Sequence, residues 1–169
     1  EPNENEATAQ VPQLYNGNIA ETFWRTSSDN IVRKYGYEYD GLNRLTNAIY
    51  QKPNASMPVT NKYNEQMSYD KNGNIQTMQR NGDFDSDSYG AIQIDDLHYF
   101  YNPDKKNQLM KVYDSSNSPK GFRDDIYDTN DVTDDYEYDA NGNMTKDDNK
   151  FISSITYNHL NLPVKINFA

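Results

Sequence analysis

The chain has 169 residues, a formal net charge of −10 and a pI near 4.5. This acidic balance argues against a nucleic-acid partner, whose backbone favours basic patches, and against docking on anionic lipid. No stretch approaches the roughly 18 apolar residues of a membrane-spanning helix, and the absence of Cys excludes disulfides, thiolate catalysis and Cys-based zinc sites.

The balance of residue types indicates aromatic strands and tight turns. Leu, Ile, Val and Phe together number 29, or 17%, which at this net charge would be typical of a disordered chain. The 15 Tyr residues oppose that interpretation, because disordered chains are poor in aromatics and a buried Tyr covers about 150–250 Å². Asn and Asp number 42, a quarter of the chain, and favour turns. We therefore expect an all-β fold with little helix.

The first segments in chain order are a tail, a strand and a turn. Residues 1–13 are polar and contain proline, and we expect them to be disordered. The alternation of Ile19, Glu21 and Phe23 then predicts a strand, and the Ser-Ser-Asp-Asn run at 27–30 predicts a turn.

A seven-residue motif that begins with Tyr-Asp then recurs along the chain. Its first full copy is Tyr39-Asp40-Gly41-Leu42-Asn43-Arg44-Leu45, and the copies at 69–75 and 138–144 match it position by position. The copy at 157–163 is weaker, the copy at 101–109 has two extra turn residues, and the copy at 15–19 is shortened. We call the aliphatic residue that closes each copy the slot residue. The slot residues are Ile19, Leu45, Ile75, Leu109 and Met144, with Pro163 in this place in the last copy.

Each copy predicts a β-hairpin. Before the turn, aromatic or apolar residues stand two apart, as Tyr35, Tyr37 and Tyr39 do, which places them on one face of a strand. Asn-Gly pairs at the turns, such as Asn72-Gly73, are strong hairpin signals because both residues tolerate positive φ. A second strand then begins at the slot residue. The residues to which we assign the repeat are Tyr37, Tyr39, Asp40, Asn43, Arg44, Leu45, Tyr69, Asp70, Gly73, Ile75, Tyr101, Leu109, Tyr138, Asp139, Gly142, Met144, Tyr157 and Asn158.

Polar inserts separate the hairpins, near 51–66, 80–97 and 114–135, and we expect them to be loops. The alternating carboxylates from Asp83 resemble a calcium loop, but Ser88 stands at its sixth position and Ile94 at its twelfth, where Gly and Glu are required. A solvated acidic loop is the favoured interpretation, and we assign no metal site and no cofactor. The pair Trp24-Arg25 could form a sugar platform, although a core anchor is favoured.

The Tyr-Asp motif resembles the YD repeat of the Rhs family of bacterial proteins, which also occurs in teneurins. The clearest copies are those at 39–45, 69–75 and 138–144. The resemblance implies a hairpin ribbon that spirals into a hollow shell, which in polymorphic toxins encloses a C-terminal toxin domain and in other members forms a surface or adhesive structure. Only Arg44 keeps the family's Arg, and no plug or self-cleaving segment is recognisable. The residues in place of this Arg are Asn18, Asn74, Gln108, Asn143 and Leu162.

These observations lead to one main hypothesis. Residues 14–169 are expected to form an array of antiparallel β-hairpins in a curved or spiralling sheet, as a non-catalytic segment of a longer secreted or cell-surface repeat protein. Such a segment would have as partners the rest of the parent protein or an adjoining chain at its C-terminal end, with a toxin cargo or secretion machinery as further candidates. The alternative is a carbohydrate- or receptor-binding module of an adhesin-like protein. Buried motif tyrosines would favour the shell, and tyrosines that line an open groove would favour the binding module.

Overall fold

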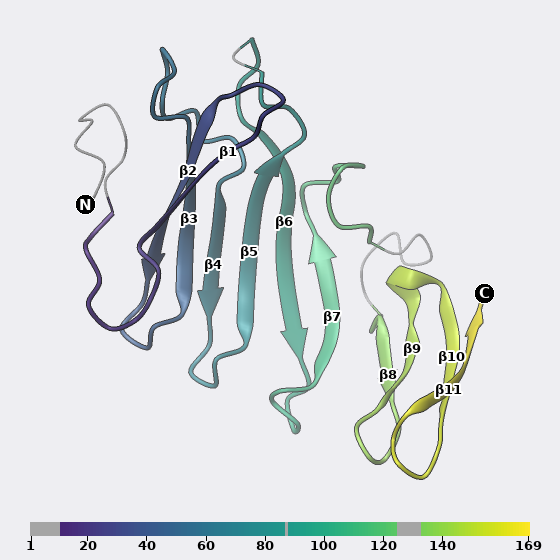
Figure 1. Ribbon diagram of the computed structural model, residues 1–169. Coiled ribbons are helices and arrows are strands. Elements are labelled where there is room, and N and C mark those ends of the chain that lie inside the picture. Colours follow the sequence, from purple (N-terminus) through teal and green to yellow (C-terminus); the bar gives the residue numbers. More distant parts are fainter. Residues whose placement is uncertain (1–10, 87, 125–132) are drawn as a thin grey trace.

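The computed structural model describes residues 11–86, 88–124 and 133–169, and it confirms an all-β fold. Eleven strands form two antiparallel sheets, and the single helical element in the described part of the chain is one 3₁₀ turn at Asp148–Lys150 (Figure 1). The strands are β1 (Glu21–Arg25), β2 (Val32–Tyr39), β3 (Leu45–Gln51), β4 (Glu65–Tyr69), β5 (Ile75–Gly82), β6 (Ile92–Tyr101), β7 (Leu109–Asp114), β8 (Tyr136–Tyr138), β9 (Met144–Asp147), β10 (Ile152–Tyr157) and β11 (Pro163–Phe168).

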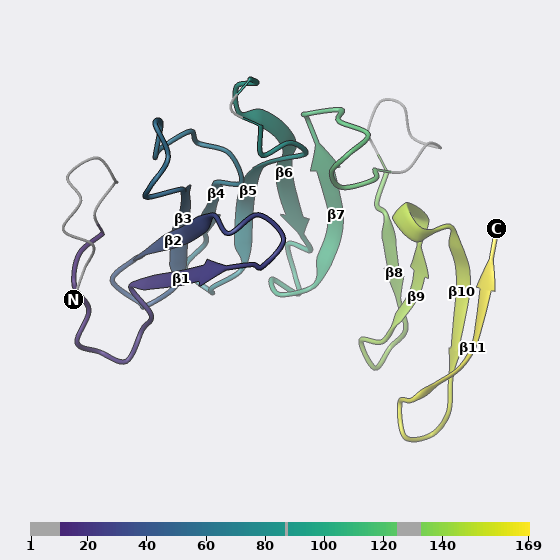
Figure 2. The same ribbon diagram turned by 45° about the horizontal axis from the view of Figure 1, so that its top comes forward.

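The topology is an uninterrupted meander. The seven-stranded sheet has the order β1-β2-β3-β4-β5-β6-β7, and the four-stranded sheet has the order β11-β10-β9-β8. Figures 1 and 2 show that the strands make one curved layer, in which β7 is followed laterally by β8. Since each strand pairs with its sequence neighbours within its own sheet, each sheet grows by adding one hairpin at a time.

The alternation predicted from the sequence places the apolar side chains on one face. Met67 lies opposite Met78, and Met78 lies opposite Leu97 on the next strand. The buried cluster of this face joins Leu97 and Val112 of the larger sheet to Tyr136 of the smaller one. Packing therefore couples the two sheets. The partly buried residues around this cluster are Met78, Tyr99, Leu109, Phe122, Tyr138 and Met144.

Asp135 joins the two sheets through hydrogen bonds. Its backbone N–H donates to the Met110 carbonyl (2.9 Å), and its Oδ2 accepts from the backbone N–H of Val112 and from Asn149 Nδ2, both at 2.8 Å. The residue is 2% exposed. The prediction of a loop near 114–135 is therefore wrong for Asp114, which belongs to β7, whereas Asp135 lies in a bend as predicted but is part of the buried junction.

The other two predicted inserts are also shorter in the structure. Strand β5 continues to Gly82 and β6 begins at Ile92, so that the connecting loop is only 83–91 within the predicted 80–97. The acidic residues of this stretch misled the prediction, since Asp95 is fully buried and pairs with Arg80 (Oδ2 to Nε, 2.5 Å). The insert near 51–66 is closed by a bridge between Gln51 and Val59, and β4 begins before its end.

The N-terminal tail was predicted to be disordered over 1–13, and residues 1–10 lie outside the described residues. The prediction is wrong for Val11, which is buried on β2. Gly36 makes this possible, because a Cβ added there would lie 2.8 Å from Val11 Cγ1. The strand expected around Glu21 is present as β1.

Candidate functional site

The turns of the copies at 39–45, 69–75, 138–144 and 157–163 have a three-residue loop. In the copy at 69–75, the Asp70 N–H donates to the Asn74 carbonyl (2.9 Å) and the Gly73 N–H donates to the Asp70 carbonyl (3.2 Å). Gly73 has φ +91°, but Asn72 is not among the residues with positive φ. Both residues of the Asn-Gly pair tolerate positive φ, but only the Gly adopts it here. The observed loop is the type I turn followed by one left-handed residue, with a bulge where the strand resumes.

The carboxylate that follows the Tyr explains this turn. Asp70 Oδ1 accepts from the backbone N–H groups of Asn72 (2.8 Å) and Asn74 (2.9 Å), so that the side chain organises the loop from within. Asp40 and Asp139 accept from the same two positions of their own loops. Asn158 does so in the last copy, which shows that the motif needs an oxygen acceptor here and not a charge.

Electrostatics favour the charged form of these caps. Hydrogen bonds from the backbone N–H and the guanidinium of Arg44 hold the pKa of Asp40 below its ordinary value. The hydrogen bonds from Asn143 do the same for the pKa of Asp139. For Asp70 burial alone would raise the pKa, but the hydrogen bonds from its loop outweigh it and the pKa is lowered.

The position of the family's Arg connects neighbouring motifs. Arg44 donates from Nε to Asp40 Oδ2 (2.6 Å) in its own turn and from Nη1 to the Asp70 carbonyl (2.9 Å) in the next. Asn74 makes the same kind of pair, from Nδ2 to Asp70 Oδ2 and to the Lys106 carbonyl, both at 2.8 Å. The Asn that replaces Arg therefore keeps both contacts. Asn143 repeats this arrangement with Asp139 and Asn161.

A hydrogen bond from the motif tyrosine to the preceding motif is the most regular feature of the structure. The Tyr69 hydroxyl donates to the carbonyl of Leu45, which is the slot residue of the motif before it, at 2.7 Å. We call this contact a rung. The same contact recurs at every step between described motifs. The rungs run from Tyr39 to Ile19 (2.9 Å), Tyr69 to Leu45 (2.7 Å), Tyr101 to Ile75 (2.9 Å), Tyr138 to Leu109 (2.6 Å) and Tyr157 to Met144 (2.7 Å).

The motif tyrosines that donate in rungs are partly buried, not fully buried as the sequence led us to expect, and Tyr15 of the shortened copy is 90% exposed. The strands that carry these tyrosines lie in one curved layer, in which each hairpin has its neighbours beside it (Figure 2). Burial still raises the pKa of Tyr69, Tyr101 and Tyr138 above the ordinary value, which keeps the hydroxyls protonated as donors at neutral pH. The two fully buried tyrosines of the described chain, Tyr50 and Tyr136, lie outside the seven-residue motif.

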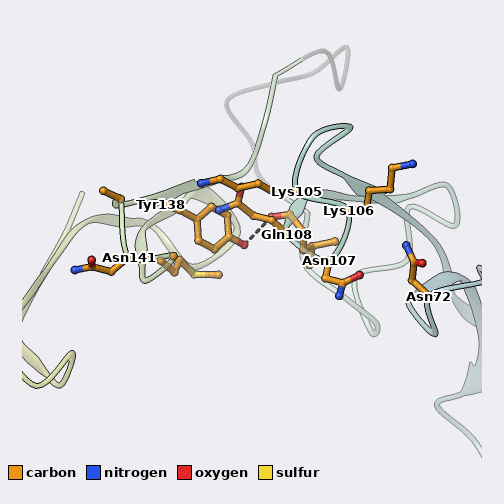
Figure 3. A pocket seen from close by; sticks show the side chains of 11 residues that line it. Asn72, Lys105, Lys106, Asn107, Gln108, Tyr138 and Asn141 are labelled. Atoms are coloured by element: carbon orange, nitrogen blue, oxygen red, sulfur yellow. Dashed lines mark hydrogen bonds between the residues drawn. The ribbon is translucent and has the colours of Figure 1, made fainter.

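A broad depression lies between the turns on either side of the sheet junction. Figure 3 shows Lys105, Gln108 and Asn141 around Tyr138, whose hydroxyl makes the rung to the backbone of Leu109. The extra turn residues of the copy at 101–109 form one wall of this depression. Its lining contains no carboxylate and no histidine, and it therefore offers no acid–base pair for hydrolysis. The lining residues are Asn72, Lys105, Lys106, Asn107, Gln108, Leu109, Tyr138, Ala140, Asn141, Gly142 and Met144.

The acidic loops of the described chain are paired with cations. Asp83 lies 3.4 Å from Lys120 Nζ, and Asp85 lies 3.1 Å from Lys52 Nζ. Asp87, the third carboxylate of the calcium-like run, lies outside the described residues. Within the described ranges no three His, Cys, Asp or Glu residues gather as metal ligands would, and no helix there has the length and apolar character needed to cross a membrane.

A scan against protein-family models and a search of curated proteins found no match to this chain. The likeness to the YD repeat therefore rests on the motif itself. Sequence reasoning found the Tyr, the Asp and the slot residue of each motif but missed the rung between them. The constant place of the slot residue after each turn was the available signal.

Proposed function

We propose that the chain is a non-catalytic structural segment of a repeat shell of the Rhs type, built by the stacking of Tyr-Asp hairpins. The observation that carries this proposal is the rung, which recurs with one geometry at all five steps between described motifs. A linkage repeated in this way is typical of a repeat array, in which each unit contacts its neighbours and stability is a sum of local terms. The depression at the sheet junction, with neither carboxylate nor histidine, gives no support to catalysis.

The partner of the last described hairpin would be another hairpin of the same type. Pro163 is the slot residue of the last motif, and no tyrosine of the described residues donates to its carbonyl. Next to it, β11 is the edge strand of its sheet, and Val164, Ile166 and Phe168 stand 61%, 47% and 68% exposed. An apolar edge strand is a ready template for another strand. The rest of the parent protein or an adjoining chain would supply that hairpin.

The larger setting follows from the resemblance and is part of the same proposal. A curved ribbon of this kind would form the wall of a secreted or cell-surface bacterial protein, with a C-terminal toxin as the candidate cargo on its concave side. Secretion machinery would then be a further partner. The binding-module alternative has an observation of its own, in a different part of the molecule, and is developed in the next subsection.

The stacking proposal can be tested by lengthening the chain. A copy of residues 148–168, which contain β10 and β11, is appended after Ala169. The copied tyrosine is expected to donate to Pro163, so that the backbone amides of 163–168 exchange hydrogen more slowly and the free energy of unfolding rises.

The control carries the same extension with the copied tyrosine changed to Ala. In this control the backbone amides of 163–168 should exchange hydrogen faster than with the intact extension, and the free energy of unfolding should rise less. If the appended hairpin leaves the exchange of 163–168 unchanged, or if the Ala control protects these amides equally, the proposal is wrong.

A further inference from the structure

Four aromatic rings cluster on the apolar face of β1–β4, away from the motif turns. Trp24 stacks on Tyr35 with ring centroids 5.5 Å apart and an interplanar angle of 19°. Tyr50 lies 5.6 Å from Tyr35 in an edge-on arrangement, and Tyr63 lies 5.3 Å from Tyr50. None of the four belongs to a motif turn or makes a rung, so that the stacking of hairpins does not account for them.

Two charged side chains complete this cluster, which lines an open cavity of about 330 Å³. Asp85 Oδ2 accepts from the Tyr50 hydroxyl at 2.8 Å, and Arg33 Nε donates to the same hydroxyl at 3.1 Å. The Tyr35 hydroxyl donates to the Tyr63 carbonyl (2.9 Å), which holds the two walls together. The cavity thus combines a mainly aromatic lining with a few oriented polar groups at one side, as small-molecule sites do.

The charges around the cavity are balanced. Arg33 pairs with Asp29 (2.5 Å) and lies 3.5 Å from Asp85, which also pairs with Lys52. Two cations therefore face two carboxylates. This balance disfavours a quaternary ammonium ligand, which an aromatic cage would otherwise accept, because two cations already share the carboxylate nearest the rings. The same balance of charge disfavours an anionic ligand, because each cation is already paired with a carboxylate.

We infer that this cavity binds one neutral pyranose ring of a glycan. The C–H groups of a pyranose face carry partial positive charge and suit the electron-rich faces of Trp and Tyr rings. Its hydroxyls can both donate and accept, which matches the carboxylate of Asp85, the guanidinium of Arg33 and the phenol hydroxyls beside them. The Tyr35 and Tyr50 hydroxyls donate to the Tyr63 carbonyl and to Asp85, so that the protein fixes the orientation of both phenols. This inference does not depend on the stacking of hairpins.

Trp24 provides the readout, because it is the single Trp of the chain and lines the cavity. Its fluorescence is followed while methyl glucoside, methyl galactoside, N-acetylglucosamine, maltose and cellobiose are titrated separately. Choline serves as a small cationic probe, and glucuronate serves as an anionic probe of the same ring size. We expect a saturable change with at least one neutral sugar at about millimolar concentration, the range of a ligand that buries little surface, and none with the charged probes.

Two variants and a control connect the signal to the cavity. Tyr63→Ala should weaken sugar binding at least tenfold by removing one wall. Asp85→Asn, which keeps the shape of the side chain, should weaken it as well and covers the case in which Tyr63→Ala does not fold. Tyr15→Ala changes a tyrosine that is 90% exposed and should leave binding unchanged.

The inference is wrong if no neutral sugar gives a saturable change, if choline or glucuronate binds instead, or if Asp85→Asn binds as well as the parent chain. The lengthening experiment measures amide exchange at 163–168, whereas this experiment measures the fluorescence of Trp24. The stacking proposal and the sugar-binding inference can therefore be refuted independently.

Discussion

Replacing Tyr138 by Phe tests the rung at the junction of the two sheets. The substitution removes one hydroxyl and keeps the half-buried ring, so that it isolates the 2.6 Å hydrogen bond to the Leu109 carbonyl. The loss of a hydrogen bond in a protein costs about 0.5–1.5 kcal/mol when the remaining partner finds water, and about 1–3 kcal/mol when it stays dry. Leu109 is itself only partly buried, which places the expected loss near 1 kcal/mol.

The measurement is chemical denaturation with a thermal melt beside it. For a chain of this length, a loss of about 1 kcal/mol lowers Tm by about 2–4 °C. Truncation to Ala also removes the ring contacts with the cluster of Leu97, Val112 and Tyr136. It should lower the free energy of unfolding by about 2–4 kcal/mol, slightly less than the loss of about 3–5 kcal/mol for fully buried aromatic residues. The expected order of stability is therefore parent, Tyr138→Phe, Tyr138→Ala.

Tyr15→Phe is the matched control, because Tyr15 holds the same motif position but its hydroxyl meets only the exposed Gln13 side chain. This variant should stay within about 0.5 kcal/mol of the parent, as surface substitutions usually do. If Tyr138→Phe is no less stable than Tyr15→Phe, the rung does not contribute to stability and the reasoning fails.

Three further predictions follow from the turns and the buried phenols. Gly142→Val should lower the free energy of unfolding in urea by about 1–3 kcal/mol, because a β-branched residue is strained at φ +86°. Gly142→Asn should lower it less, since Asn43 and Asn161 adopt positive φ in other copies, and equal losses would contradict the argument. Arg44→Leu should lower Tm more than Arg44→Asn. The reason is that Asn74, at the same position of the copy at 69–75, keeps the hydrogen bonds to the Asp of its own turn and to the next turn. The reverse order of Tm would show that the side chain at this position does not connect the turns. The free energy of unfolding should fall between about pH 10 and pH 12. Burial raises the pKa of Tyr35 and Tyr136 from 10.0 to about 12, so that in this interval the folded state still holds protons that the unfolded state has lost. A free energy of unfolding that does not change with pH over this interval would show that these phenols are not buried.

The sequence was sufficient to predict the strands and the hairpins. Period-two alternation before each turn and an Asn-Gly pair, or an Asn in place of its Gly, within the turn are local signals. The strands that end at Tyr39, Tyr69 and Tyr138 are where these signals place them. The turn type does not follow from the Asn-Gly pair alone, because it also depends on a side chain. In a two-residue loop Asp70 could not accept from both Asn72 and Asn74, and these two hydrogen bonds favour the longer loop.

Burial was harder to predict because it depends on partners distant in sequence. Lys34 is fully buried through its pair with Glu21 on the neighbouring strand (2.5 Å), and Lys62 is buried through its contact with the Ser86 carbonyl. Neither contact has a local signature. The same holds for the aromatic cavity, which is lined by Trp24 together with Tyr63 and Asp85, two residues of stretches that the sequence presented as polar inserts. A polar insert is therefore weak evidence for a hydrated loop in this chain.

The rung explains why the tyrosine and the slot residue keep their places relative to the turn. Leu45 is partly buried, and its carbonyl accepts from Tyr69 of the next hairpin. A one-residue shift of register would turn its side chain to the opposite face and its carbonyl away from Tyr69. Each rung contributes only about 1 kcal/mol, but five together approach the net stability of a typical small domain, about 5–15 kcal/mol. In the described chain no other sheet is stacked on the face of this layer. The rungs between neighbouring hairpins therefore help to fix the register of the strands and the order of the hairpins.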